Sequence, residues 1–134
     1  MKFKFLEHTG DVKFQAFGKN INELFENSAL ALKEVICGKI KVKGGRKKTI
    51  KVNGRDYESM LHNFLEELLY LLETEKFIMA KTKVKVKGLK LSAVVYGDKS
   101  GNYNFVNPVK AVTYSEIFVK YEKGRLVCQV VLDV

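Results

Sequence analysis

The chain has 134 residues, of which 46% are hydrophobic and 29% charged, a balance typical of a globular domain and not of a disordered chain. One proline and ten glycines exclude a collagen-like or proline-rich protein. Because no apolar run approaches the ~20 residues of a membrane-spanning helix, and two cysteines are too few for a disulfide scaffold, we expect a single soluble, cytoplasmic domain over residues 1–134.

The formal net charge of +9 is unevenly distributed along the chain. Residues 39–55 carry +8 and residues 76–90 carry +6, with no acidic residue in either stretch. The remaining residues therefore carry −5. The sequence thus predicts two basic segments on an otherwise acidic domain.

Two strands and a helix are predicted first. Residues 3–5 and 12–17 have the two-residue period of strands. Asn20 is a good helix N-cap and Gly38 a good C-terminal stop, so we predict a helix from about residue 21 to 37. Its apolar stripe consists of Ile21, Leu24, Phe25, Leu32, Val35 and Ile36.

A second helix is predicted after a short strand. Residues 49–52 form the strand, and Asn53-Gly54 is a strong turn signal. Asp56 then caps a helix that extends through Leu72. We expect this helix to pack centrally, because it has the most hydrophobic stripe in the chain: Leu61, Phe64, Leu65, Leu68 and Leu72.

Four more strands complete the predicted fold. They cover residues 81–87, 89–96, 111–121 and 126–132. Runs of neighbouring strands with only two helices favour the α+β class. We expect one domain in which two helices pack on a largely antiparallel, mixed sheet.

The strand at 81–87 alternates strictly between lysines and other residues. One face carries Lys81, Lys83, Lys85 and Lys87, because successive side chains of a strand point to opposite faces. Such a strip could bind phosphates, but a charged, solvated face also protects a sheet from aggregation. Because neither interleaved aromatic residues nor a nucleic-acid-binding motif accompanies the lysines, we favour the solvated face.

Enzymatic motifs are missing from the sequence. Neither GxxxxGK[ST] nor GxGxxG occurs, and the possible histidine bases are His8 and His62. His62 falls within the second predicted helix, where a surface or boundary role suits it. We predict Cys37 and Cys128 to be small buried hydrophobic residues. The sequence does not indicate an acid–base enzyme.

An acidic group forms if the last strand lies near the second strand. Asp11 precedes that second strand, and Asp133 lies next to the carboxylate of Val134. Three clustered carboxylates repel one another unless a cation neutralises them, and such oxygen ligands suit Ca²⁺, Mg²⁺ or Mn²⁺. Alternatively, Asp11 is a turn residue and Asp133 a solvated chain end.

Several separated blocks of the sequence resemble the archease family over nearly the whole chain. The N-terminal block is E-H-T-G-D-V, and K-A-V-T-Y and V-L-D-V follow near the end. The matching segments are residues 7–12, 16–18, 23–29, 65–70, 110–114 and 131–134. Such blocks in order are far more specific than any one of them.

The resemblance implies a non-catalytic cofactor protein of the tRNA-splicing RNA ligase, which joins 2′,3′-cyclic-phosphate or 3′-phosphate ends to 5′-hydroxyl ends. Archeases promote formation of the ligase–guanylate intermediate, allow multiple turnover and broaden the nucleotides that the ligase accepts. RNA contact by the activator itself is expected to be indirect or weak. An RNA-binding module or chaperone that uses the lysine-rich stretches is the alternative. A metal-dependent hydrolase is disfavoured, since no base or nucleophile accompanies the carboxylates.

The resemblance also implies site residues. Its metal ligands fall on Asp11, Asp133 and Val134, with calcium as the expected ion and magnesium or manganese as alternatives. Lys110 of the K-A-V-T-Y block is assigned to partner contact. The chain departs from the family pattern at four places, none of which removes a carboxylate: Gly10 for Ala, Lys13 for Gly, Ser115 for His, and Val127-Cys128-Gln129 for an aromatic residue.

Overall fold

The computed structural model describes residues 1–134 and contains two helices and seven strands. None of its helices has the length and apolar character needed to span a membrane. In chain order, the elements are β1 Phe3–Leu6, β2 Val12–Gly18, α1 Ile21–Cys37, β3 Arg46–Asn53, α2 Tyr57–Glu75, β4 Phe77–Lys87, β5 Lys90–Lys99, the short 3₁₀ turn η1 Ser100–Asn102, β6 Ala111–Glu122 and β7 Arg125–Asp133.

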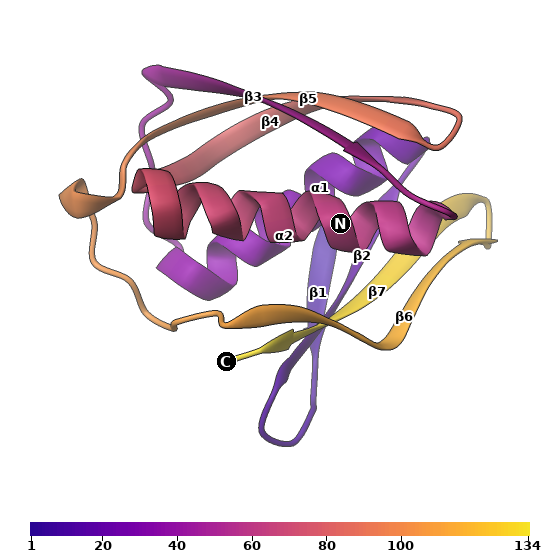
Figure 1. The fold of residues 1–134 in the computed structure, drawn as a ribbon. Coiled ribbons are helices and arrows are strands. Elements are labelled where there is room, and N and C mark those ends of the chain that lie inside the picture. The colour runs from indigo at the N-terminus through magenta and orange to yellow at the C-terminus, as the bar shows by residue number, and fades with distance from the viewer.

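The strands form two antiparallel sheets, and both helices lie between them (Figure 1). Sheet A has the order β1-β2-β7-β6, and sheet B has the order β3-β5-β4. Helix α1 packs mainly on β2 and β4, and α2 packs on β6, β4 and β3. Each sheet therefore buries one face against the helices. In sheet A, the central strand β7 is buried on its outward face as well.

The α+β class, the two helices and the antiparallel pairing are confirmed. The strands form two sheets, whereas the sequence predicted one sheet that carries both helices. The reason lies in α2, whose buried apolar residues cover more of the helix surface than a single stripe. They are Met60, Leu61, Phe64, Leu65, Leu68, Leu69 and Leu71. A helix that is apolar on two sides is stable only with a layer on each side.

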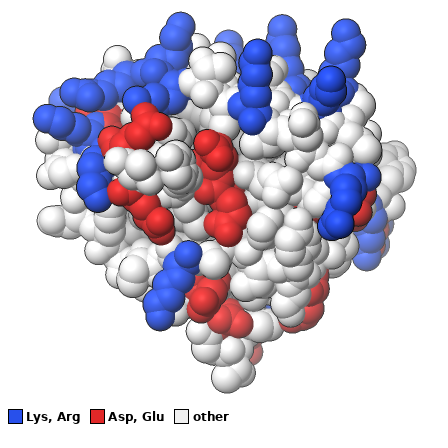
Figure 2. Space-filling model, in the orientation of Figure 1, with Lys and Arg blue, Asp and Glu red and all other residues white.

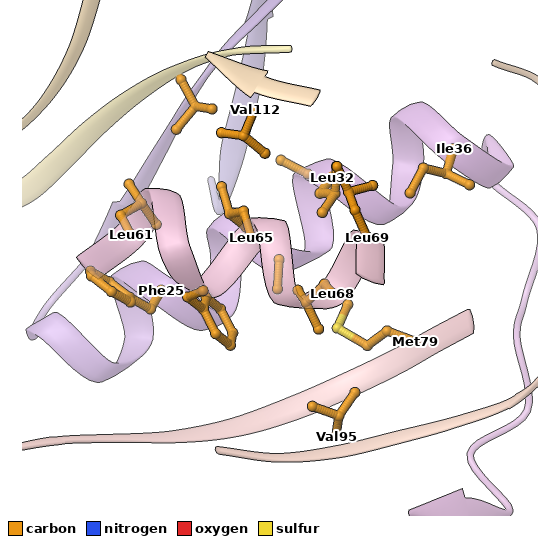
Figure 3. Packing of buried hydrophobic residues seen from close by; sticks show 14 of the residues in the cluster. Phe25, Leu32, Ile36, Leu61, Leu65, Leu68, Leu69, Met79, Val95 and Val112 are labelled. Atoms are coloured by element: carbon orange, nitrogen blue, oxygen red, sulfur yellow. The ribbon is translucent and has the colours of Figure 1, made fainter. Parts of the chain in front are cut away.

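The predicted central position of α2 is confirmed by the core. A cluster of 31 buried residues extends from sheet A through the helices to sheet B. Figure 3 shows Leu65 and Leu68 of α2 between Val112 of β6 and Val95 of β5. The helices themselves meet where the rings of Phe25 and Phe64 stack with centroids 6.0 Å apart.

The local signals at the ends of α1 act as predicted. Asn20 accepts a hydrogen bond from the Glu23 amide at 2.9 Å, which satisfies one of the free N–H groups of the first turn. Gly38 ends the helix with a positive φ of 69°. Helix α2 begins with a capping box between Asp56 and Ser59 and ends three residues later than predicted.

The outer edge of sheet B is covered by side chains of α1. The amide of Val84 donates to Glu26 Oε2 at 2.9 Å, and the amide of Val86 donates to Asn22 Oδ1 at 2.8 Å. These bonds occupy N–H groups that an edge strand would otherwise present to another chain. Edge strand β4 is thus tied to the helix layer and blocked against further pairing.

Candidate functional site

The predicted acidic residues lie at one end of sheet A. Strands β2 and β7 pair antiparallel, with Val12 opposite Leu132. One more step in this register sets Asp11 opposite Asp133. Because Leu132 is fully buried against the helices, alternation places both aspartates on the outward face of the sheet. The pairing of β2 with β7 therefore brings together residues separated by most of the chain.

The K-A-V-T-Y block borders the same end of the sheet from its other side. Ala111 lies opposite Asp133 in the β6–β7 ladder. The amide of Lys110 donates to the Asp133 carbonyl at 2.7 Å, which holds the last residues of β7 in place. The Lys110 side chain is exposed and forms no ion pair. It is available to a partner beside Val134.

The carboxylates at this end have little cationic compensation within the chain. Neither the Asp133 side chain nor the carboxylate of Val134 forms an ion pair, and Asp11 has a single ion-pair partner, His8, at 3.7 Å. No group of three or more His, Cys, Asp or Glu side chains is gathered for metal binding. A third oxygen donor would have to come from the main-chain carboxylate of Val134. The donors are all hard oxygens, which is the chemistry that Ca²⁺ and Mg²⁺ prefer. In donor type, the three residues fit a hard divalent cation.

An ion-pair group that the sequence did not predict lies next to Asp11. The Glu116 carboxylate accepts a hydrogen bond from Lys13 Nζ at 3.0 Å, and its other oxygen lies 3.0 Å from His8 Nε2. Hydrogen bonds from Lys13 and His8 hold the pKa of the Glu116 carboxyl below its ordinary value. Glu116 has a positive φ of 60° and lies in an irregularity between the two paired segments of β6. Nothing in a glutamate predicts this conformation, so the sequence pattern offered no signal for it.

His8 links this ion-pair group to Asp11. Its Nε2 faces Glu116, whereas its Nδ1 is buried, has no hydrogen-bond partner and lies 3.7 Å from Asp11 Oδ2. The turn before β2 is therefore held to β6 through a side-chain bridge. The E-H-T-G-D-V block contributes both Asp11 and the histidine that orients its turn.

His62 has a structural position, in agreement with the predicted boundary role. Its Nε2 lies 2.8 Å from the carbonyl oxygen of Val112 and donates to it. The imidazole ring stacks on Tyr114 with centroids 4.1 Å apart. Together these contacts attach the K-A-V-T-Y block to α2.

Both cysteines are buried, as predicted. Burial raises the pKa of the Cys37 thiol, and burial raises that of Cys128 to about 11. Cys128 lies 3.1 Å from Ser28 Oγ within the core. Thiols that stay protonated at neutral pH are poor nucleophiles, so neither cysteine suits catalysis.

Comparison with known proteins identifies relatives that cover the whole chain. The model of the Archease protein family matches residues 3–134. A protein named "Protein archease" from Methanosarcina mazei is 36% identical over 140 residues, covering 99% of this chain and 96% of the relative. A "Protein archease" from Pyrococcus abyssi is also 36% identical over 140 residues, covering 99% of both chains.

Two solved structures share the fold. The solution structure of protein 1598 from Methanobacterium thermoautotrophicum has a TM-score of 0.82 and 31% identity, and the match covers 99% of both chains. A crystal structure from Thermotoga maritima, described as an archease and possible chaperone, has a TM-score of 0.68. That second match is 19% identical over 98% of this chain and 96% of the other, so it supports the fold alone.

Proposed function

Because the chain belongs to the archease family, we propose that it is a non-catalytic activator of the tRNA-splicing RNA ligase. In this role it promotes guanylylation of the ligase and so allows many ligation cycles per ligase molecule. It also broadens the nucleotides that the ligase accepts.

One observation supports this proposal most strongly: three separate family blocks meet at one end of sheet A. The E-H-T-G-D-V block contains Asp11, the V-L-D-V block contains Asp133, and the K-A-V-T-Y block begins with Lys110. Their strands are neighbours in the order β2-β7-β6. We therefore assign the proposed contact with the ligase to this surface, which all three family blocks form.

We further propose that this end of the sheet holds a divalent cation, with calcium as the expected ion and magnesium or manganese as alternatives. The ligands would be Asp11, Asp133 and the carboxylate of Val134. Calcium accepts irregular sets of oxygen ligands more readily than magnesium does. When bound, the ion would neutralise the carboxylates and supply a positive centre at the contact surface.

An activator works by binding one state of its target more tightly than another. The outward face at Asp11 and Asp133, which are both half-buried, would therefore contact the ligase in its guanylylation-competent arrangement, with exposed Lys110 beside it. Since Cys37, Cys128 and His62 are all engaged within the fold, none of them is assigned chemistry of its own.

The test is multiple-turnover ligation by the RNA ligase of the same organism, with and without this protein. We expect more ligated product per ligase molecule and faster formation of the ligase–guanylate. Equal single-turnover yields would be uninformative, because the ligase can start already guanylylated. Unchanged product per ligase, together with an unchanged guanylylation rate, would disprove the proposal.

A further inference from the structure

A second surface, on the opposite side of the molecule, brings together lysines from three strands. The outward face of sheet B carries seven of them, which we call the lysine face: Lys47, Lys51, Lys81, Lys83, Lys85, Lys87 and Lys90. All seven are exposed. Figure 2 shows Lys and Arg side chains gathered along the top of the molecule, where Figure 1 places sheet B.

The strand register arranges these lysines in two tracks. Lys47 and Lys51 of β3 and the four lysines of β4 flank central strand β5, so that Lys51 and Lys85 both lie opposite Ser92, and Lys47 and Lys81 both lie opposite Tyr96. The seventh, Lys90, lies on β5 opposite Lys87. Lysines two residues apart on a strand are separated by about 6.6 Å, and the two tracks lie about 10 Å apart. From Lys90 to Tyr96 no carboxylate occupies an outward position of β5. The next outward residue, Asp98, lies beyond the last paired lysines and accepts hydrogen bonds from Tyr103 and the Lys99 amide.

The central strand offers polar and aromatic groups between the two tracks. Ser92 lies under a shallow hollow whose rim includes Lys51, Lys85, Lys87 and Lys90. At the other end, Lys81 Nζ lies 5.4 Å from the centre of the Tyr96 ring. Strand β4 alone contains no outward aromatic residue, but sheet pairing places one within the lysine face. The sequence favoured a solvated face because it showed no aromatic residue among the lysines, and Tyr96 now supplies one.

We propose that the lysine face binds single-stranded RNA through its phosphates, with Tyr96 stacking on a base. Evenly spaced point charges suit the evenly spaced phosphates of a nucleic-acid strand, whereas the carboxylates of an acidic protein surface follow no such repeat. Basic tracks combined with an aromatic platform are the usual means of binding single strands without sequence preference. The proposal is independent of ligase activation, because it concerns the other sheet. It involves no residue of the carboxylate end of sheet A, by which we mean Asp11, Asp133 and Val134.

The test measures binding of a fluorescently labelled single-stranded RNA of about a dozen nucleotides to the full chain by anisotropy, over a series of salt concentrations. About five phosphate contacts give a slope of log K against log salt near −3.5, or a loss of roughly a hundredfold between about 50 and 200 mM salt. Replacing Lys81, Lys83, Lys85 and Lys87 by Gln should reduce that slope by about 2 to 3.

A matched control removes the same charge elsewhere. Lys2, Lys19, Lys33 and Lys39 lie outside both sheets, and their replacement by Gln should change RNA affinity by less than about twofold beyond the general effect of net charge. Thermal unfolding of both variants checks that they fold. If both variants weaken RNA binding equally, or if the unaltered protein does not bind this RNA at about 50 mM salt, the lysine face is not an RNA site.

Two further measurements distinguish RNA from other polyanions. Tyr96→Leu should weaken RNA binding about fivefold or more, because a stacked base is lost, and should leave heparin binding unchanged. Unlabelled RNA should displace the probe far better than polyglutamate at equal charge concentration. Equal competition by polyglutamate would indicate an acidic protein partner instead, and unaltered RNA affinity in Tyr96→Leu would contradict the stacking contact; either result overturns the proposal as stated.

Discussion

At the scale of single residues, Asp11 and Asp133 illustrate how little local sequence says about a carboxylate. Each follows the ordinary pattern of a turn or a strand end. Their position opposite one another depends on a β2–β7 ladder that joins the two ends of the chain. Neither carboxylate has a lysine or arginine partner, so no cationic side chain offsets the charge that this pairing brings together.

We predict that Asp11→Asn and Asp133→Asn each weaken calcium binding by about tenfold or more, because affinity follows the charge of the ligand set. Calcium at about 100 times its Kd should stabilise the unaltered protein by roughly 2.7 kcal/mol, and a tenfold weaker variant by roughly 1.4 kcal/mol at the same concentration. Thermal unfolding with and without calcium measures this difference. Equal calcium-dependent shifts in all three proteins would eliminate the aspartates as ligands.

The role of the Val134 carboxylate has to be tested by extending the chain, because no side-chain substitution removes a main-chain carboxylate. A few Gly or Ser residues added after Val134 keep every side chain but move the terminal charge away from Asp11. We predict weaker calcium binding by calorimetry in the extended protein. If the extended protein binds calcium as tightly as the original, Val134 is not a ligand and the two aspartates alone remain.

A second carboxylate with a defined role is Asp98, far from the carboxylate end. Hydrogen bonds from the Tyr103 hydroxyl, at 2.6 Å, and from the Lys99 amide lower the pKa of Asp98. Tyr103 Oη in turn accepts from the Lys43 amide at 2.9 Å. This carboxylate thus connects the loop after β5 with the basic loop before β3.

The lowered pKa predicts a pH dependence of stability. The unfolded pKa of an aspartate is about 3.9, so the contribution of ionised Asp98 is complete above that pH and is lost as the pH falls through the lower folded value. We expect Asp98→Asn to have a lower Tm than the unaltered protein near neutral pH, and the difference to narrow in acid. A difference in Tm that stays constant from neutral to strongly acidic pH would contradict this role.

At the scale of elements, the packing of β4 on β5 requires a glycine. A methyl group on Gly97 would collide with the carbonyl oxygen of Ile78 and the ring of Phe77. This close approach lies beside the irregularity in the β4–β5 register between Met79 and Lys81. The start of the lysine face is therefore positioned by backbone-to-backbone packing.

We predict that Gly97→Ala lowers the free energy of unfolding by about 1–3 kcal/mol, the usual cost of overpacking. Gly101→Ala is the matched control, because nothing lies within 4 Å of an added methyl group there. Urea unfolding of both variants measures the effect. Similar stability of the two variants would mean that β4 and β5 separate easily at this point.

Element boundaries show which features of the fold were accessible from sequence. Helix α1 has the predicted limits because Asn20 and Gly38 end it through their own chemistry. Strand β3 begins at Arg46, three residues before the prediction, because Arg46, Lys47 and Lys48 pair through backbone groups with β5. Three consecutive charged residues lack the alternation of polar and apolar residues that predicts a strand. Local signals therefore predicted both ends of α1 and the start of α2, but they did not predict the end of α2 or the start of β3.

At the scale of the whole molecule, the division of the strands into two sheets was beyond the sequence. Periodicity identifies the buried face of a strand but not the partner on which that face packs. The same limit applies to the candidate site: the aspartates were predicted, whereas Glu116 was missed because its left-handed conformation in β6 has no sequence signal. The strand at 81–87 has no aromatic residue on its lysine-bearing face, and only its pairing with β5 places Tyr96 beside Lys81.

The architecture separates two surfaces of different chemistry. The carboxylate end lies on the outward face of sheet A and the lysine face on the outward face of sheet B, with both helices between them (Figure 1). Under the two proposals, the ligase would contact one of these surfaces and RNA the other. Changes on either surface should therefore have separable effects.

The most direct test of the central claim is the rate of ligase guanylylation from GTP without RNA, which isolates the activator surface. We predict acceleration by the unaltered protein and by the variant with Gln at Lys81, Lys83, Lys85 and Lys87. Asp11→Asn should accelerate the reaction far less. If Asp11→Asn is fully active, or if the four lysine changes abolish acceleration to the same extent as Asp11→Asn, the carboxylate end of sheet A is not the surface through which this protein activates the ligase.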